Sequence, residues 1–354
     1  MDDQQFLVDG LVCPVPLAHT DQIVMGHGSG GRMSHDLIKN IFLAMLGNPI
    51  LNAGNDAAIC SVNEQTRLAV STDSHVVSPL FFPGGDIGRL AVCGTVNDVA
   101  MLGAAPLFLT AGFILEEGLD AKVLNAVVAS MKQAANEAGV QFVAGDTKVL
   151  QKGKGDGIYI NTCGIGIIPP GLQIGGERAQ PGDAVILSGS IGDHGMAVLA
   201  ARGELGIETN LSSDVAPLNS LVQLMLKTSD RIHVLRDPTR GGVATSLNEI
   251  ALQSKVNIFI QEEQIPIKPA VSAICELLGF DPLYVANEGK LLAIVHPEDA
   301  DILIRAMRTH PLGTQTTLIG YIEEASAGRV VMHTKIGTKR IVDMLAGEML
   351  PRIC

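Results

Sequence analysis

The chain ends in Pro351-Arg352-Ile353-Cys354, which places a thiol on the last residue. Chain termini are usually poorly ordered unless contacts tie them down, so a terminal thiol is badly placed for a structural role. Gly347 and Pro351 disfavour a helix through this segment, and we expect an extendable arm. At about 3.3 Å per residue, the last ten residues would span roughly 33 Å. The pattern predicts that Cys354 reaches into a pocket; an incidental exposed cysteine is the alternative.

A glycine-rich segment, Gly26-His27-Gly28-Ser29-Gly30-Gly31, lies between a short apolar stretch and a helical pattern over Met33–Leu46. Glycines let backbone N–H groups approach an anion, and a helix N-terminus adds favourable partial charge. The segment lacks the Gly-Lys-Ser/Thr of a Walker A loop. A dinucleotide site would also need an acidic residue about 20 residues later, where this chain has loop residues. We therefore predict another kind of phosphate-binding loop, with a merely flexible loop as the alternative.

Aspartates recur where apolar segments end, beside glycine-rich turns: Asp56, Asp73, Asp98, Asp146 and Asp237. Any one of them is explained most simply as a helix cap or a turn residue. Together they indicate carboxylates that converge on magnesium, because Mg²⁺ takes hard oxygen ligands alongside phosphates.

Two further charged residues stand next to these motifs. Lys148 directly follows the Asp146 turn, and Glu288 precedes an apolar strand pattern over Leu291–Val295. Both are candidates for catalytic roles, for which ordinary surface charge is the alternative.

The elements that must position these residues alternate between strand and helix patterns in both halves of the chain. The first half contains strand patterns over Arg67–Asp73, Leu107–Leu115, Gln141–Asp146 and Ile158–Ile168, and a helix over Ala121–Ala138. A second series runs from the strand Asp183–Leu187 to the strand Val330–His333, after the break at Ile168-Pro169-Pro170-Gly171. We expect an α/β (α+β) protein with a lead over 1–22, domains over 23–170 and 171–334, and a mobile tail over 335–354.

Composition excludes several classes of protein. The net charge of −12 argues against nucleic-acid binding, which needs a basic surface. The apolar stretch Val99–Leu115 contains Gly103, Pro106 and Gly112, so we expect a buried helix end followed by a core strand, not a membrane span. Met1-Asp2-Asp3 is acidic where a signal peptide begins with basic residues. Six scattered cysteines without a C-x-x-C pair are typical of a reducing compartment, and we expect a cytoplasmic protein.

Taken in order, these motifs resemble those of the HypE family of nickel–iron hydrogenase maturation proteins. This family contains carbamoyl dehydratases of the aminoimidazole-ribonucleotide-synthetase (PurM-like) superfamily. The resemblance runs from about residue 23 to the end, and the terminal Pro-Arg-Ile-Cys is its most specific element. The other matching motifs are His27–Gly31, Ser71–Ser74, Gly94–Ala100, Gly145–Val149, Gly192–Gly195, Asp237–Gly242 and Asn287–Leu291.

The resemblance implies two α/β domains, with the N-terminal sheet pairing with that of a second subunit in a homodimer. It also implies that ATP and Mg²⁺ bind near the domain cleft. The implied nucleotide contacts are Gly28, Ser29, Gly30, Gly31, Asp73, Asn97, Asp98, Asp146 and Thr147. The implied magnesium ligands are Asp56, Asp73, Asp98 and Asp237.

The activity implied by the resemblance is the ATP-dependent dehydration of a thiocarboxamide on Cys354 to a thiocyanate, which supplies the cyanide ligand of the hydrogenase iron. Glu288 is then the general base, and Lys148 stabilises charge on the oxygen that is phosphorylated. The implied partners are the carbamoyltransferase HypF, which loads the cysteine, and the HypC–HypD complex, which receives the cyanide.

Two alternatives remain at this stage. Selenophosphate synthetase shares the glycine and aspartate motifs, but its reactive residue lies near the N-terminus, where Cys13 is the candidate in this chain. A non-catalytic scaffold whose terminal thiol forms a mixed disulfide with a partner is the other.

Overall fold

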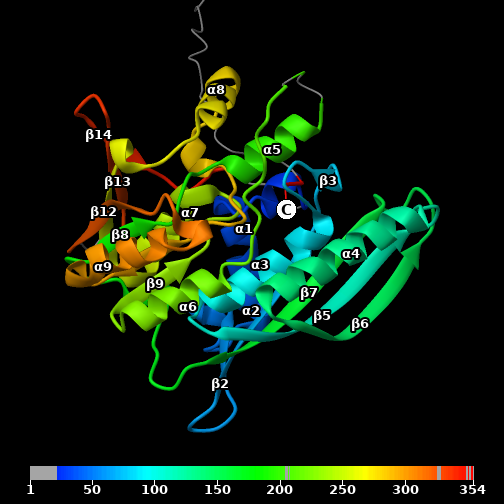
Figure 1. The fold of residues 1–354 in the computed structure, drawn as a ribbon, viewed down its shortest axis with the longest axis horizontal. Helices are drawn as coiled ribbons and strands as arrows, with labels where there is room; N and C mark the ends of the chain where they lie inside the picture. Colours follow the sequence, from blue (N-terminus) through cyan, green and yellow to red (C-terminus); the bar gives the residue numbers. More distant parts are fainter. Residues whose placement is uncertain are drawn as a thin grey trace, which may run out of the picture.

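The computed structural model describes residues 22–203, 206, 208–324, 328–347, 350 and 352–353. Two large mixed sheets and their helices form the two halves of the protein (Figure 1). The helices are α1 (Arg32–Leu37), α2 (Leu43–Leu46), α3 (Ile87–Met101), α4 (Ala121–Ala138), α5 (Asp193–Ala201), α6 (Asn219–Thr228), α7 (Gly242–Ser254), α8 (Pro269–Leu278) and α9 (Pro297–Arg308).

The strands of the first half are β1 (Ala58–Ser61), β2 (Arg67–His75), β3 (Phe81–Phe82), β4 (Gly85–Asp86), β5 (Ala105–Glu116), β6 (Gln141–Leu150) and β7 (Ile158–Ile168). Those of the second half are β8 (Ala184–Leu187), β9 (Ile232–Arg236), β10 (Val256–Gln261), β11 (Leu292–Val295), β12 (Thr317–Glu324), β13 (Val330–His333) and β14 (Lys339–Val342).

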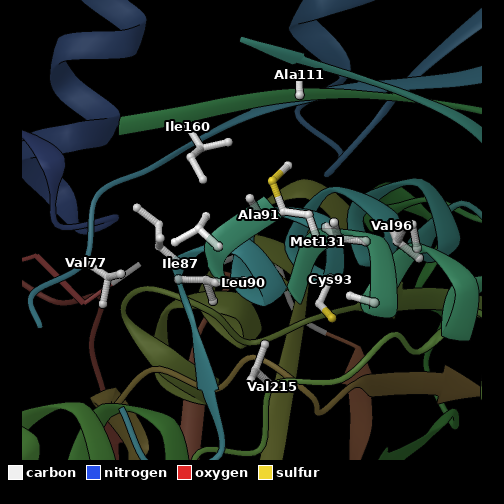
Figure 2. Packing of buried hydrophobic residues seen from close by; sticks show 14 of the residues in the cluster. Val77, Ile87, Leu90, Ala91, Cys93, Val96, Ala111, Met131, Ile160 and Val215 are labelled. Atoms are coloured by element: carbon white, nitrogen blue, oxygen red, sulfur yellow. The ribbon is translucent and has the colours of Figure 1, made fainter. Parts of the chain in front are cut away.

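The N-terminal sheet has the strand order β1-β2-β7-β5-β6, and α3 and α4 cover one of its faces (Figure 1). Almost every residue of α3 is buried, and Ile87, Leu90 and Val96 belong to one hydrophobic core with Ile160 of β7 and Met131 of α4 (Figure 2). Two glycines of β7 permit this close approach. A Cβ on Gly164 would lie 2.7 Å from Thr95 Cγ2. A Cβ on Gly166 would lie only 2.5 Å from Val99 Cγ1. The helix that carries Asp98 is therefore fixed directly against the sheet.

The other face of this sheet is apolar and only partly covered by the described residues. Phe108, Ile114 and Ile167 point to it and are 41%, 42% and 43% exposed. The edge strand β6 is exposed along nearly its whole length. A monomer rarely leaves a continuous apolar face open, so this surface is typical of an interface.

The C-terminal sheet has the order β14-β13-β10-β12-β8-β11-β9. The core on one of its faces is formed with α7, and the core on the other with α6 and α9. The central strands β8 and β11 are buried at every residue, because helices cover both of their faces.

Most of the expected elements are present, and α4 and β7 have the expected bounds. The stretch Val99–Leu115 is the end of α3 followed by β5, as expected, and no helix in the described ranges is long and apolar enough to cross a membrane. One difference concerns the expected tail over 335–354. Its first part contains β14, which pairs antiparallel with β13 and extends the C-terminal sheet. The lead over 1–21, Cys13 and Cys354 lie outside the described residues.

Candidate functional site

The candidate site is a group of buried and half-buried carboxylates contributed by both domains. Asp56 precedes β1, Asp73 lies in β2 and Asp98 in α3, whereas Asp237 follows β9 and Glu288 precedes β11. Burial raises the pKa of Asp98 well above its ordinary value, and the charges of Asp237, Asp73 and Asp56 raise it further. Three of the aspartates expected as magnesium ligands, Asp56, Asp73 and Asp237, thus lie near enough to the fourth, Asp98, for their charges to act on it.

Three of these carboxylates have partners within the protein. Asp56 accepts a hydrogen bond from Arg236 Nη1 at 2.6 Å, but burial outweighs this cation and raises the pKa of Asp56 to about 6. Asp98 accepts a hydrogen bond from Ser71 Oγ at 2.6 Å. Asp73 Oδ2 lies 3.1 Å from His75 Nε2. Burial by itself would raise the pKa of Asp73, yet His75 outweighs it and lowers that pKa.

Asp237 and Glu288 are the carboxylates with unused acceptors. Among the described residues, neither Asp237 Oδ2 nor Glu288 Oε1 has a hydrogen-bond partner, although both side chains are buried. Burial raises the pKa of Asp237 and of Glu288 well above the ordinary range, and neighbouring carboxylates raise both further. A buried acceptor without a partner is costly, and a cation or a proton donor would relieve that cost.

The segment that carries Glu288 is held from three sides. Asn97 Nδ2 donates to the carbonyl of Glu288 at 3.3 Å, and its Oδ1 accepts from Leu218 N at 2.7 Å. Asn287 Nδ2 donates to the carbonyl of Pro238 at 2.9 Å and so joins Glu288 to the Asp237 segment. Asp214 accepts from the backbone N–H of Glu288 at 3.2 Å. Asn97, which we expected at the nucleotide, is therefore occupied in positioning Glu288.

The glycine segment forms part of the wall of a cavity. Arg240 Nη1 donates to the carbonyl of Gly28 at 3.0 Å, and Ser29 Oγ donates to that of Gly26 at 2.8 Å. Gly30 has a φ of +77°, a conformation that favours glycine. A cavity of about 670 Å³ lies here, and its lining includes Gly28, Ser29, Ser74, Arg240, Leu350 and Ile353. The glycine segment and the described end of the tail therefore share one cavity.

Asp146, Thr147 and Lys148 lie elsewhere within the chain. Asp146 is in register with Gly112, Asn161 and Ser74 across the sheet, and its side chain is therefore on the face opposite to Asp73. Three strand spacings, about 14 Å, separate it from Ser74. Lys148 Nζ bonds Asp146 Oδ2 at 2.6 Å, and both side chains are largely exposed.

The Asp146–Lys148 pair nevertheless adjoins the tail cavity. It lines a depression of about 330 Å³ that also contains Ser74 and Val76, two residues that line the larger cavity too. Within a single copy of the protein, Asp146 and Lys148 therefore lie away from the carboxylate group.

Sequence reasoning missed several residues of the site. Arg236, His75 and Asp214 each bind a candidate residue or its backbone, yet none belongs to a motif that predicts this. Lys290, in the motif that contains Glu288, forms an ion pair with Asp214 at 3.0 Å. The lysine in this motif was the one sequence feature that could have pointed to an acidic partner such as Asp214. Among the described residues, no group of three or more His, Cys, Asp or Glu side chains is close enough to hold a metal ion by itself.

Comparisons with known proteins agree on one family. The model of AIR synthase related protein matches its N-terminal domain to residues 54–168 and its C-terminal domain to residues 180–333. Carbamoyl dehydratase HypE of Cupriavidus necator is 54% identical over 94% of this chain and 95% of its own length.

Two solved structures are also similar. HypE in complex with ATP is 50% identical, with a TM-score of 0.78 over 94% of this chain and 100% of that one. A HypE–HypF complex contains a chain that is 48% identical, with a TM-score of 0.83 over 87% of this chain and 99% of that one.

The crowded carboxylates make stability depend on pH in a defined direction. Because the pKa of Asp98 is raised by folding, the folded protein keeps a proton that the unfolded chain releases above about pH 3.9. Stability is therefore lost as the pH rises from that value through the folded pKa. We predict that Asp98→Asn gains stability over the wild type across this window, by up to about 1.4 kcal/mol per pH unit. Urea unfolding at several pH values measures it.

The exposed Asp301→Asn variant on α9 is the matched control and should follow the wild type. A constant difference between Asp98→Asn and wild type at every pH would contradict the prediction.

Proposed function

The chain belongs to the HypE family of carbamoyl dehydratases, and we propose that it uses ATP to dehydrate a thiocarboxamide on its own Cys354 to a thiocyanate. The observation that carries this proposal is the common cavity. Ile353, the neighbour of Cys354, lines it together with the glycine segment. Asn97 and Asn287 hold the backbone around Glu288. Asp73 and Asp237 lie near enough to raise the pKa of Glu288. The names of the relatives favour this activity over a selenophosphate synthetase or a scaffold.

ATP is the proposed phosphate donor, because a similar HypE was solved with ATP and the glycine segment borders the cavity. We propose Mg²⁺ as its counter-ion. Magnesium usually takes one or two carboxylates and completes its shell with phosphates and water, so a preformed group of three is not required. Asp98 and Asp237, whose Oδ2 has no hydrogen-bond partner among the described residues, would hold it. When bound, the ion would neutralise phosphate charge.

The reaction must convert an amide oxygen into a leaving group. The oxygen of the S–CO–NH2 group attacks the γ-phosphorus of ATP, the bond from that phosphorus to the bridging oxygen breaks, and ADP leaves. The carbon–oxygen bond then breaks, phosphate departs with the electron pair, and the nitrogen loses both of its protons. The products are S–C≡N, ADP, phosphate and a proton. Positioning and electrostatic stabilisation supply most of the catalysis in such transfers.

Glu288 is the proposed general base for the nitrogen. Its Oε1, which no described residue hydrogen-bonds, is available to take a proton. Burial raises the pKa of Glu288, which makes the carboxylate a stronger base than an exposed one. Asp214 and Asn97 fix the backbone on which it stands.

The proposed partners follow from the same reaction. A relative was solved as a HypE–HypF complex, which supports a HypF-type carbamoyltransferase as the enzyme that loads Cys354. A HypC–HypD complex would receive the cyanide. We place this chemistry in the cytoplasm, where a free thiol stays reduced.

We further propose that the chain is a homodimer. The outer face of the N-terminal sheet, with Phe108, Ile114 and Ile167, is the surface that a second copy would cover. An isologous contact would bury the same face of both copies. It would also cover the edge strand β6, on which Asp146 and Lys148 lie, and bring Lys148 into a more enclosed setting for its proposed role.

The activity is tested by the mass of Cys354 after incubation with a carbamoyl donor, the transferase and MgATP. The wild type should gain about 25 Da as the cyano product, whereas Glu288→Gln should stall at about 43 Da as the carbamoyl adduct. Cys354→Ala should form neither adduct but still bind ATP. The exposed Glu263→Gln variant is the matched control and should behave as wild type. A cyano adduct on another cysteine, or in Cys354→Ala, would refute the proposal.

The dimer is tested by light scattering at micromolar concentration. Phe108→Glu should convert the dimer to monomer, because a charge would be buried without a partner. Ile302→Glu, at a similarly exposed position on α9, should stay dimeric. A wild type that is monomeric throughout, or a dimer broken only by Ile302→Glu, would exclude this interface.

A further inference from the structure

The last described residues of the chain are held mainly by their backbone. The carbonyl of Arg352 accepts hydrogen bonds from the backbone N–H of Ser78 at 3.2 Å and from Arg202 Nη2 at 3.0 Å. The carbonyl of Ile353 accepts one from His194 Nε2 at 2.8 Å. Two consecutive carbonyls immediately before Cys354 are therefore bound by groups of the folded protein.

The side chains of the same two residues have specific partners. Ile353 is only 4% exposed, forms an antiparallel bridge with Val77 and belongs to the same hydrophobic core as Val198 of α5. The guanidinium of Arg352 pairs with Asp156. Arg352 also has a φ of +54°, a conformation that residues other than glycine rarely adopt. These contacts must outweigh that backbone strain for the tail to stay where it is.

Both side chains that bind the tail carbonyls belong to one short segment. His194 lies in the first turn of α5, and Arg202 directly follows its last residue (Figure 1). His194 Nδ1 accepts from Ser213 Oγ at 2.8 Å, which leaves Nε2 to carry the proton that it donates to the tail. The rings of Phe82 and His194 pack edge to face, with their centroids 5.4 Å apart. This contact fixes the plane of the imidazole.

The same helix is bonded to the segment that carries Glu288. Gly195 N donates to the carbonyl of Ala286 at 3.1 Å, and Gly192 N donates to Asn287 Oδ1 at 2.8 Å. A Cβ on Gly195 would lie 2.5 Å from Val285 Cγ1, so only glycine permits this approach. The position of α5 relative to Glu288 is thus fixed by backbone contacts at its N-terminus.

We propose that α5 is the dock for the end of the chain, with His194 and Arg202 as positioning residues for the dehydration step. The inference rests on the proposed function for the chemistry at Cys354, but the dock itself is a property of the tail. By binding the carbonyl of Ile353, the dock holds the residue before the carrier at the cavity wall. Proximity of this kind turns an encounter into an intramolecular step.

Amide hydrogen exchange in the full-length protein measures docking without any enzymatic activity. The N–H of Ser78 is bonded to the tail carbonyl, so it exchanges when the tail leaves. Arg202→Met and His194→Phe should each speed exchange at Ser78 by about tenfold, the effect expected from losing one such bond. Arg202 Nε also donates to the carbonyl of Ser78 at 3.0 Å, so His194→Phe is the variant that acts on Ser78 through the tail. His194→Gln retains a donor at the corresponding position and should restore most of the protection. Arg305→Met, on the exposed side of α9, is the matched control.

A second measurement follows the reaction. Single-turnover conversion of the carbamoyl adduct to the cyano product should slow by a similar factor in Arg202→Met and His194→Phe, with ATP affinity unchanged. Unchanged exchange at Ser78 in His194→Phe would overturn the dock. So would equal acceleration at Ser78 and at the core amides of α3, because the residues would then support the fold and not the tail.

Failure of the proposed function gives a different result. A wild type that forms no adduct on Cys354 would remove the chemistry, while exchange at Ser78 would still report whether α5 holds the tail.

Discussion

Mutual repulsion among buried carboxylates is the constraint on which the rest of this structure depends. Burial and the charges of Asp56 and Asp73 raise the pKa of both Asp98 and Asp237, and Asp237 raises that of Asp98 further. Glu288 Oε1 has no hydrogen-bond partner among the described residues. Such a group destabilises the fold at neutral pH unless cations or protons compensate. Such a group in a folded protein is typical of a functional site, where charged residues needed for function reduce the stability of the fold.

The two domains share the task of holding this group together. Close packing of α3 on β7 fixes Asp98 on the N-terminal side, and Asn97 reaches from the same helix to the backbone of Glu288 on the other. Asn287 joins Glu288 to the Asp237 segment and also to the start of α5. One network of hydrogen bonds between asparagine side chains and the backbone therefore relates the carboxylates to the helix that holds the end of the chain.

Sequence reasoning predicted the elements with strong periodicity, such as α4 and β7. It placed the aspartates where strands or helices end, whereas Asp73 lies within β2 and Asp98 within α3. It missed β14, where Lys339 and Arg340 are exposed and give no strand pattern. It placed Asp146 and Lys148 with the other charges, because the sequence does not reveal which strand lies at the sheet edge or which face a residue takes. The tail contacts of His194 were also invisible, since they depend on residues far apart in the chain.

The most direct test of the account is the dependence of ATP affinity on Mg²⁺, measured by calorimetry in the wild type and in Asp98→Asn. If repulsion between the carboxylates and the phosphates governs the site, the wild type should bind ATP weakly without Mg²⁺ and much more tightly with it. Asp98→Asn should bind ATP with a smaller response to Mg²⁺, because one negative charge and one ligand are gone. Equal ATP affinity with and without Mg²⁺ in both proteins would contradict the central claim.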